Sequence, residues 1–166
     1  MTIRPARIPD ALAVARVHVR SWQVAYRGIL PEEYLASLQP EERARRYTFE
    51  SPDAGVPHTL VGLDGDALVG FATVRIEDPA VPVGELAALY VDPEHWDRGF
   101  GAALVRHARE ELVRRGCRTA HLWLLQGNVR GERFYRLDEW ALDGRRRSDR
   151  VWGLDVTEVG MSRELA

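Results

Sequence analysis

Apolar residues in the first part of the chain recur with the period of an α-helix. After a short extended run at 2–6, apolar positions three and four apart predict an amphipathic helix that begins near Pro9 and ends near Tyr26. Two further prolines fit the first turn of short helices, which we expect at 31–38 and 40–49. The buried face expected for the first helix consists of Leu12, Ala15, Val19, Trp22 and Tyr26.

Beyond residue 57 the pattern changes to runs that are typical of strands. Two such runs flank an Asp-Gly pair at 64–65, which predicts a hairpin. A loop with Pro79 and Pro82 then leads into a mostly apolar run of the kind found in central strands. A helix that Gly116 ends is predicted from the apolar stripe Phe100, Leu104, Ala108 and Leu112. The elements expected in this part are strands 58–63, 67–75 and 85–91, a helix 99–115, a strand 119–125, a helix 128–137 and strands 140–147 and 151–162.

This order of strands and helices predicts an α/β layer with a mixed sheet, in one domain over residues 1–166. The composition agrees, because 45% hydrophobic and 29% charged residues can support one compact core. A formal net charge of −2 gives no overall attraction to nucleic acid, and no run approaches the roughly 18 apolar residues of a membrane span. We therefore expect neither a nucleic-acid nor a membrane partner.

The residue types also exclude several chemistries. All 23 basic residues are arginine, so lysine-dependent Schiff-base and Walker-type chemistry is excluded. The five histidines and the single cysteine show no metal-ligand spacing, so we expect no metal site. The lone Cys117 and an N-terminus without an apolar signal core predict a cytoplasmic protein.

The most informative segment is the Gly-x-Gly loop that follows the strand 85–91. Two glycines where a helix begins let a ligand approach free N–H groups and the positive end of the helix dipole, and Arg98 adds a cation. By itself the spacing fits a tight strand-to-helix turn equally well. Leu104 stands where a dinucleotide-binding motif needs a small residue, and a P-loop needs a lysine.

Two runs in order carry a resemblance to a known family. Residues 89–104 read Leu-Tyr-Val-Asp-Pro-Glu-x-x-x-x-Gly-x-Gly-x-x-Leu and resemble the acyl-CoA pyrophosphate loop of the GNAT-type N-acetyltransferase superfamily. The run 122–135 is similar to the strand and the Asn-to-Tyr helix that follow in that family. The N-terminal helix pair and the ending Glu158-Val159 also resemble bacterial members, so the likeness covers nearly the whole chain.

The resemblance implies a three-layer α/β fold whose mixed, mostly antiparallel sheet is splayed between the fourth and fifth strands. It implies an enzyme that transfers an acetyl group from acetyl-CoA to a primary amine of a small molecule or peptide, by direct attack in a ternary complex. A homodimer would also fit the family. The acceptor would lie against the first helices, with Trp22, Tyr26 and Tyr34 as candidate walls, although each is more often a core residue.

The same resemblance places coenzyme A in the splay. The backbone around Leu89 and Val91 would bind the pantetheine arm, the loop 98–102 would bind the pyrophosphate, and Asn128 would contact the arm. Asn128 also stands where a helix N-cap belongs, and it can fill both roles. The cofactor-binding residues expected in full are Leu89, Tyr90, Val91, Trp96, Asp97, Arg98, Gly99, Phe100, Gly101, Ala102, Asn128, Arg133 and Phe134.

The resemblance also implies Glu85 as the base and Tyr135 as the acid. Strand alternation puts Glu85 on the face of Ala87, Leu89 and Val91, an apolar setting that disfavours the charged carboxylate, unless a bulge resets the alternation. The simpler alternative is an ion pair with an arginine. Adjacent helix residues point about 100° apart, so we expect Phe134 in the core and Tyr135 in the site, where it would protonate the departing thiolate.

Two departures from the family pattern keep a second hypothesis open. Trp96 stands where the family usually has Gln or Arg, and Asp138-Glu139-Trp140 replace its usual Gly-Phe. A third departure, Gly131, weakens the last helix. An acyl-CoA-binding sensor or interaction module without transfer is therefore the alternative function. The cluster Arg145-Arg146-Arg147 with Arg150 is most simply a solvated hairpin turn, and binding of an acidic acceptor or of nucleic acid is its minority interpretation.

Overall fold

The computed structural model describes residues 1–49, 57–76, 78, 80–151 and 153–165, so the predicted loop position Pro79 lies outside the described residues. None of the described helices is long and apolar enough to span a membrane. The elements are β1 (Thr2–Pro5), the 3-10 helix η1 (Ile8–Asp10), α1 (Ala11–Ala25), α2 (Glu32–Ser37), α3 (Pro40–Ala44), β2 (His58–Asp64), β3 (Ala67–Arg75), β4 (Val83–Val91), the 3-10 helix η2 (Pro93–His95), α4 (Phe100–Arg114), β5 (Thr119–Leu125), α5 (Val129–Leu137), β6 (Ala141–Val151) and β7 (Leu154–Glu164).

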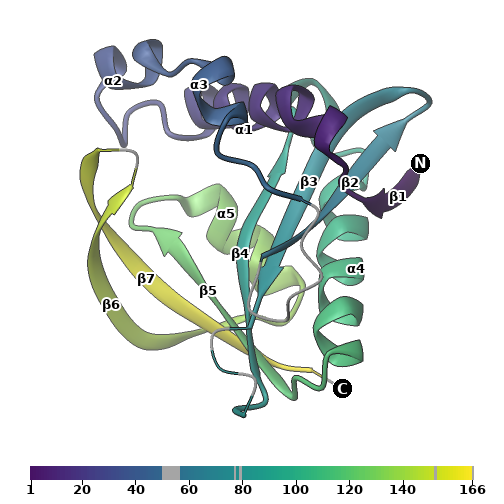
Figure 1. Ribbon diagram of the computed structural model, residues 1–166. Helices are drawn as coiled ribbons and strands as arrows, with labels where there is room; N and C mark the ends of the chain where they lie inside the picture. The colour runs from purple at the N-terminus through teal and green to yellow at the C-terminus, as the bar shows by residue number, and fades with distance from the viewer. Residues whose placement is uncertain (50–56, 77, 79, 152, 166) are drawn as a thin grey trace.

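Seven strands form one sheet in the order β1-β2-β3-β4-β5-β7-β6 (Figure 1). Every neighbouring pair is antiparallel except β4 and β5, which are parallel. This confirms the predicted α/β fold with a mixed, mostly antiparallel sheet. The expected hairpin turn between β2 and β3 is also present, with Gly65 at a positive φ of 59°.

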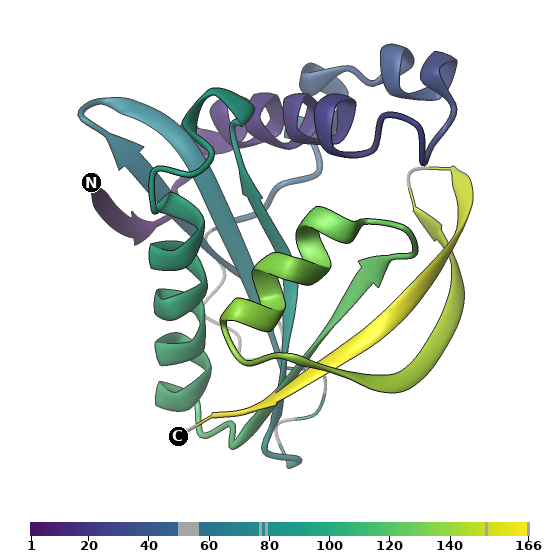
Figure 2. The same ribbon diagram turned by 180° about the vertical axis from the view of Figure 1, so that it is seen from behind.

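Helices cover the two halves of the sheet unequally. In the half formed by β1–β4, α1 packs on one face and α4 on the other (Figures 1 and 2). The half formed by β5, β7 and β6 has α5 on the α4 side. On the opposite face, called the front face below, β7 is covered near Val156, which packs against the end of α1 and α2.

The α4 packing follows the predicted stripe closely. Phe100, Leu104, Ala108 and Leu112 are all buried in the main core, together with residues of β3, β4 and β5. Two strand glycines let this helix approach the sheet, because a Cβ on Gly84 would lie 2.5 Å from Leu112 and one on Gly70 would lie 2.9 Å from Leu104. The sequence therefore identified the helix face, and the structure supplies the reason for the glycines opposite it.

The first helix differs from its prediction in which residues it buries. Leu12 is 36% exposed, whereas His18, which is not among the residues expected on the buried face, is 4% exposed. The reason is that α1 packs against α3 as well as the sheet, and the Nδ1 atom of His18 lies 2.9 Å from the hydroxyl of Tyr47. The predicted helix 40–49 is also shorter, since α3 ends at Ala44.

The closing hairpin is present, with its turn later than predicted. β6 continues to Val151 and β7 begins at Leu154. Arg145, Arg146 and Arg147 consequently lie inside a strand rather than in a turn. An arginine-rich run gives no strand signal by itself, and its pairing with β7 provides the strand conformation.

Candidate active site

The central opening of the fold lies between β4 and β5. The two strands pair only from Val83 to Glu85 on β4, opposite Thr119 to His121 on β5. Beyond this point they diverge, and α5 lies behind the gap (Figures 1 and 2). This is the predicted splay between the fourth and fifth strands, and Glu85 stands at its apex.

A bulge in β4 lies just beyond the apex. Leu86 pairs with Val74 and Ala88 with Thr73, so Ala87 has no partner on β3. The alternation of faces therefore shifts by one residue at Ala87, as a bulge requires. Leu86, Leu89 and Val91 face the α4 side.

The bulge corrects the expected surroundings of Glu85. Its side chain lies on the same face as Ala88 and Tyr90 rather than on the face of Leu89 and Val91. Glu85 is 3% exposed and forms an ion pair with Arg75, its pairing partner on β3. The arrangement is the one that the simpler alternative, an arginine ion pair, predicted for this residue.

The backbone of β4 presents free edges to the splay. Asp92 donates to the carbonyl of Val69, which makes these residues a hydrogen-bonded pair of the antiparallel ladder. Because such pairs alternate along a strand, the backbone groups of Leu89 and Val91 point away from β3, toward β5. The carbonyl of Val91 already accepts bonds from Ser21 Oγ at 2.9 Å and Trp96 Nε1 at 2.7 Å.

The Gly-rich loop at the open end of β4 leaves backbone N–H groups free where α4 begins. Asp97 and Gly99 both have a positive φ, and Gly99 is the N-cap of α4 without any side-chain cap. The first helical bond runs from the N–H of Ala103 to Gly99. The N–H groups of Phe100, Gly101 and Ala102 make no bond within the described part of the chain, so they are available to a phosphate group.

Side chains around the loop hold it in place. A Cβ on Gly101 would lie 3.1 Å from the ring of Phe134, so this glycine lets α5 pack under the loop. Trp96, which stands where the family usually has Gln or Arg, ties the loop to Val91 through its indole N–H. Arg130 lies 4.2 Å over that indole and also pairs with Asp97 at 3.1 Å.

The loop cation Arg98 is directed toward the β2–β3 hairpin. It is half exposed, and its guanidinium pairs with Asp64 at 2.9 Å. The same Asp64 oxygen lies 3.9 Å from His95, which is in the turn that precedes the loop. Arg133, the other predicted cofactor cation, is exposed on α5.

Tyr135 and Phe134 differ from their expected burial. Tyr135 is 8% exposed and its ring belongs to the main core, 6.1 Å from the ring of the fully buried Trp140. Phe134 is the partly buried residue of the two. The substitution of Trp for the family's usual Phe at 140 supplies the large ring against which Tyr135 packs.

Burial also sets the proton affinity of Tyr135. Desolvation, followed by the fields of Tyr90 and Asp138, raises the pKa of its hydroxyl well above the usual value. The hydroxyl makes no hydrogen bond to any residue that the structure describes. It therefore stays protonated at neutral pH and has a proton to donate.

Asn128 is the N-cap of α5, as its position predicted. Its side-chain oxygen accepts the N–H of Gly131 at 2.9 Å. A Cβ at Gly131 would lie 2.5 Å from the Asn128 amide, so the glycine that weakens the helix makes room for its cap. The amide N–H groups of Asn128 remain available to a ligand.

The aromatic residues predicted for the acceptor site gather near the open end of the splay. Trp22 and Tyr26 are buried in one cluster with Leu35 and Val156, and Tyr34 packs against it. The hydroxyl of Tyr26 lies 3.5 Å from that of Tyr90. Burial, then the Tyr90 hydroxyl, raises the pKa of Tyr26 well above its usual value.

Sequence reasoning missed several residues on the front face. Arg75 pairs with Glu85 at the apex, and Trp123 and Glu158 lie on β5 and β7 beside the splay, next to Arg147 of the predicted arginine cluster. Trp123 could have been found, because it alternates with the buried residues Leu122 and Leu124 and must face the other side of β5. Arg75 and Glu158 carry no such signal.

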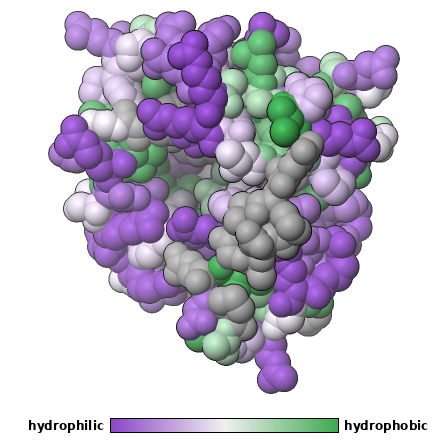
Figure 3. All heavy atoms as spheres, viewed as in Figure 1, coloured by the Kyte–Doolittle hydropathy of each residue, from purple (hydrophilic) through white to green (hydrophobic). Residues whose placement is uncertain are grey.

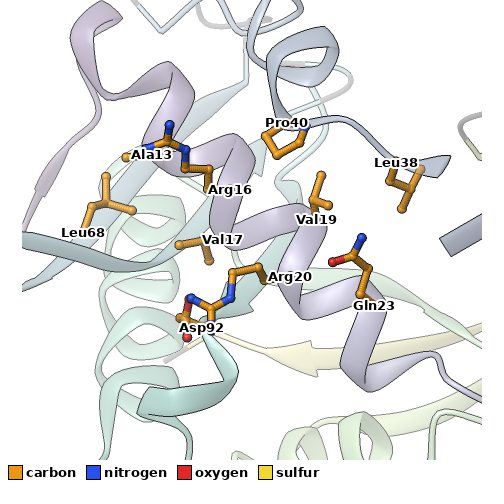
Figure 4. A pocket seen from close by; sticks show the side chains of 10 residues that line it. All are labelled: Ala13, Arg16, Val17, Val19, Arg20, Gln23, Leu38, Pro40, Leu68 and Asp92. Carbon is orange, nitrogen blue, oxygen red and sulfur yellow. The ribbon is translucent and has the colours of Figure 1, made fainter. Parts of the chain in front are cut away.

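A shallow groove of about 440 Å³ follows the outer side of α1 and is separate from the splay (Figure 4). Arg20 reaches across it to Asp92, at 3.1 Å, the residue that ends β4 and caps η2. The groove contains none of the predicted site residues. Its ion pair connects α1 to the turn before the Gly-rich loop.

Comparison with known proteins now identifies the family. The Acetyltransferase (GNAT) family model matches residues 19–138. The chain belongs to the GNAT acetyltransferase family. It is 32% identical to an uncharacterized N-acetyltransferase, YuaI, of Bacillus subtilis over 132 residues, which are 77% of this chain and 73% of that protein.

Further relatives agree on the GNAT fold. The chain is 26% identical to a spermidine N(1)-acetyltransferase of Thermoplasma acidophilum, over 80% of this chain and 83% of that protein. The crystal structure of a PaiA N-acetyltransferase from Thermoplasma acidophilum in complex with coenzyme A has a TM-score of 0.68 and 22% identity, and covers 99% of both chains.

At residues 138–140, where the sequence departs from the usual GNAT pattern, the structure shows how the new residues are accommodated. Glu139 has a positive φ of 61°, the conformation that Gly adopts most easily. Its carboxylate pairs with Arg163 at 2.7 Å, and Trp140 fills the core behind it. The segment therefore turns at Glu139 in the left-handed conformation, and the Arg163 ion pair and the buried Trp140 hold the residues around it.

Proposed function

We propose that this GNAT protein transfers an acetyl group from acetyl-CoA to a primary amine of a small molecule or peptide, by direct attack in a ternary complex. The observation that carries the proposal is the combination of an anion cradle at the mouth of the splay with an acidic residue at its apex. The spermidine acetyltransferase relative supports a small amine as the acceptor.

The residues of the splay fit coenzyme A. The free N–H groups of 100–102, at the start of α4, would hold the pyrophosphate. The inward-pointing backbone groups of Leu89 and Val91, with the Asn128 amide, would hold the pantetheine arm. When bound, acetyl-CoA supplies a thioester whose carbonyl carbon is attacked by the amine nitrogen.

We assign the two proton transfers to Glu85 and Tyr135. Glu85 takes the proton that the amine releases as its new C–N bond forms. Since its carboxylate is buried and paired with Arg75, we place this transfer through one water molecule rather than by direct contact. The neutral hydroxyl of Tyr135 gives a proton to the sulfur that leaves when the C–S bond breaks.

The first test is the thermal stability of the purified protein with acetyl-CoA, coenzyme A or NAD. A ligand at about 100 times its Kd adds about 2.7 kcal/mol to the free energy of unfolding, which is a shift of several degrees. We expect a shift with both CoA forms and none with NAD. The absence of a shift at millimolar acetyl-CoA would contradict the proposal.

The second test is turnover across a panel of primary amines. Free CoA should be released faster only when an acceptor amine is added. Stable binding of acetyl-CoA with no amine-dependent release across the whole panel would instead indicate the binding module without transfer.

A further inference from the structure

The arginine cluster of β6 divides between the two faces of the strand. Arg146 donates to the side-chain oxygen of Gln126 at 2.7 Å. Arg145 and Arg147 instead lie over the ring of Trp123, with guanidinium carbons 5.1 and 4.3 Å from the ring centroid. We call the set Arg145, Trp123 and Arg147 the arginine ladder.

A bulge in β6 builds this ladder. Leu142 pairs with Met161 and Arg146 with Val159, so residues 143–145 oppose Gly160 alone. A Cβ on Gly160 would lie 2.6 Å from the Asp143 carboxylate, so the glycine makes room for Asp143 to fold over the strand. Bulges of this kind re-aim side chains beside functional sites, and this one directs Arg145 onto the indole.

The guanidinium groups are held in place and keep unused donors. Arg145 pairs with Asp143 at 2.6 Å, and Arg147 pairs with Glu158 at 2.7 Å. Their side chains are still 47% and 34% exposed. The Nε and Nη1 donors of Arg145 have no partner among the described residues. A fixed planar guanidinium with free N–H groups matches a carboxylate.

The ladder lies on the side from which an acceptor would approach the splay. Trp123 is two residues beyond His121, the last position of β5 that pairs with β4. On β4 the bulge at Ala87 is likewise two residues beyond Glu85. Trp123 and Ala87 therefore each lie about 7 Å along their strand from the apex. Figure 3 shows a hollow with a largely hydrophilic rim on this face, opposite the face that α4 and α5 cover (Figure 2).

We propose that the arginine ladder binds a carboxylate of the acceptor, so that the substrates are amines of amino-acid or short-peptide size that carry a carboxylate. The inference rests on the proposed acetyl transfer and specifies its substrate class. A polyamine, the substrate type named for the spermidine acetyltransferase relative, has no carboxylate for the two guanidinium groups to bind.

The test compares each amino acid or dipeptide with its own carboxamide, which has the same amine and no carboxylate. We measure kcat/KM for both forms, and spermidine, with the wild type and with Arg145→Gln and Arg147→Gln. The matched control is Arg146→Gln, which removes the same charge from the opposite face of the same strand. Calorimetric titration of the CoA-bound protein with the same pairs measures binding independently of turnover.

We expect the wild type to prefer the carboxylate form at least tenfold over its carboxamide. Arg145→Gln should lower kcat/KM for the carboxylate form about tenfold and leave the carboxamide and the KM for acetyl-CoA unchanged. Arg146→Gln should change none of these values.

Two results would overturn the ladder's role while leaving acetyl transfer intact. One is a carboxamide or spermidine that reacts as well as the best carboxylate, and the other is an equal effect of Arg145→Gln and Arg146→Gln. If no amine is acetylated at all, the proposed function fails. In that case the titration still decides the inference, since the absence of carboxylate-dependent binding would refute it.

Discussion

The two halves of the sheet differ in how helices cover their faces. The β1–β4 half is covered on both faces, by α1 and α4, and its side chains form most of the buried core. The β5-β7-β6 half has a helix on one face, while its front face carries Trp123, Arg145, Arg147 and Glu158. The closed half carries Glu85 and the Gly-rich loop between β4 and α4, and the open half leaves most of its front face uncovered by helices.

The largest expected contrast between the halves is in stability. Leu104 is fully buried in the closed half, so Leu104→Ala should lower the free energy of unfolding by about 3–5 kcal/mol, through lost burial and the cavity left behind. Leu142, 44% exposed on β6, is the control, and Leu142→Ala should cost less than about 1 kcal/mol. Denaturant titration measures both, and equal losses would refute the contrast.

The next effect concerns the apex where the halves meet. Glu85→Gln should lower kcat/KM about 100-fold at neutral pH, because the released proton then has no acceptor at this position. The KM for acetyl-CoA should remain unchanged, since the cradle lies at the other end of β4. Glu110→Gln, on the outer surface of α4, is the control. Unchanged kinetics at saturating acceptor would exclude Glu85 as the base.

A smaller effect on turnover is expected at Tyr135 of α5, which lies behind the splay. Tyr135→Phe should lower kcat about tenfold, because the departing sulfur loses its proton donor. The melting temperature should barely change, since the ring remains and the hydroxyl bonds to no residue in the described part of the chain. A large loss of stability with normal turnover would instead make Tyr135 a core residue only.

The smallest expected effect is on the pH dependence of stability, through the buried His18 of the closed half. Burial, then the charge of Arg43, holds the pKa of His18 well below its usual value. The unfolded chain therefore binds a proton that the native state does not, so stability from this group is complete above about pH 6.5 and falls as the pH drops. The slope from one such group is at most about 1.4 kcal/mol per pH unit.

We expect the free energy of unfolding of His18→Gln to differ less between pH 7.5 and pH 5.5 than that of the wild type. Denaturant titration at the two pH values measures the difference. An identical pH dependence in the two proteins would show that His18 is accessible to protons in the native state, and α1 would then cover the sheet less tightly than the structure indicates.

Local patterns predicted the closed half well. The stripe Phe100 to Leu112 and the Asp-Gly hairpin specify their elements through side-chain period and turn chemistry alone. The predictions that failed depend on a second neighbour. His18 is buried because α3 joins the sheet in covering α1, and Tyr135 is buried because Trp140 packs on it.

The candidate site shows the same division between local and tertiary information. The sequence by itself determined the Gly-rich loop, the Asn128 cap and the order of strands around them, because each depends on residues close together in the chain. Only the tertiary structure decided that Glu85 faces Arg75 and that two of three consecutive arginines meet Trp123. Both results follow from bulges, in β4 and β6, which change the face that a side chain occupies without leaving a mark in the periodicity.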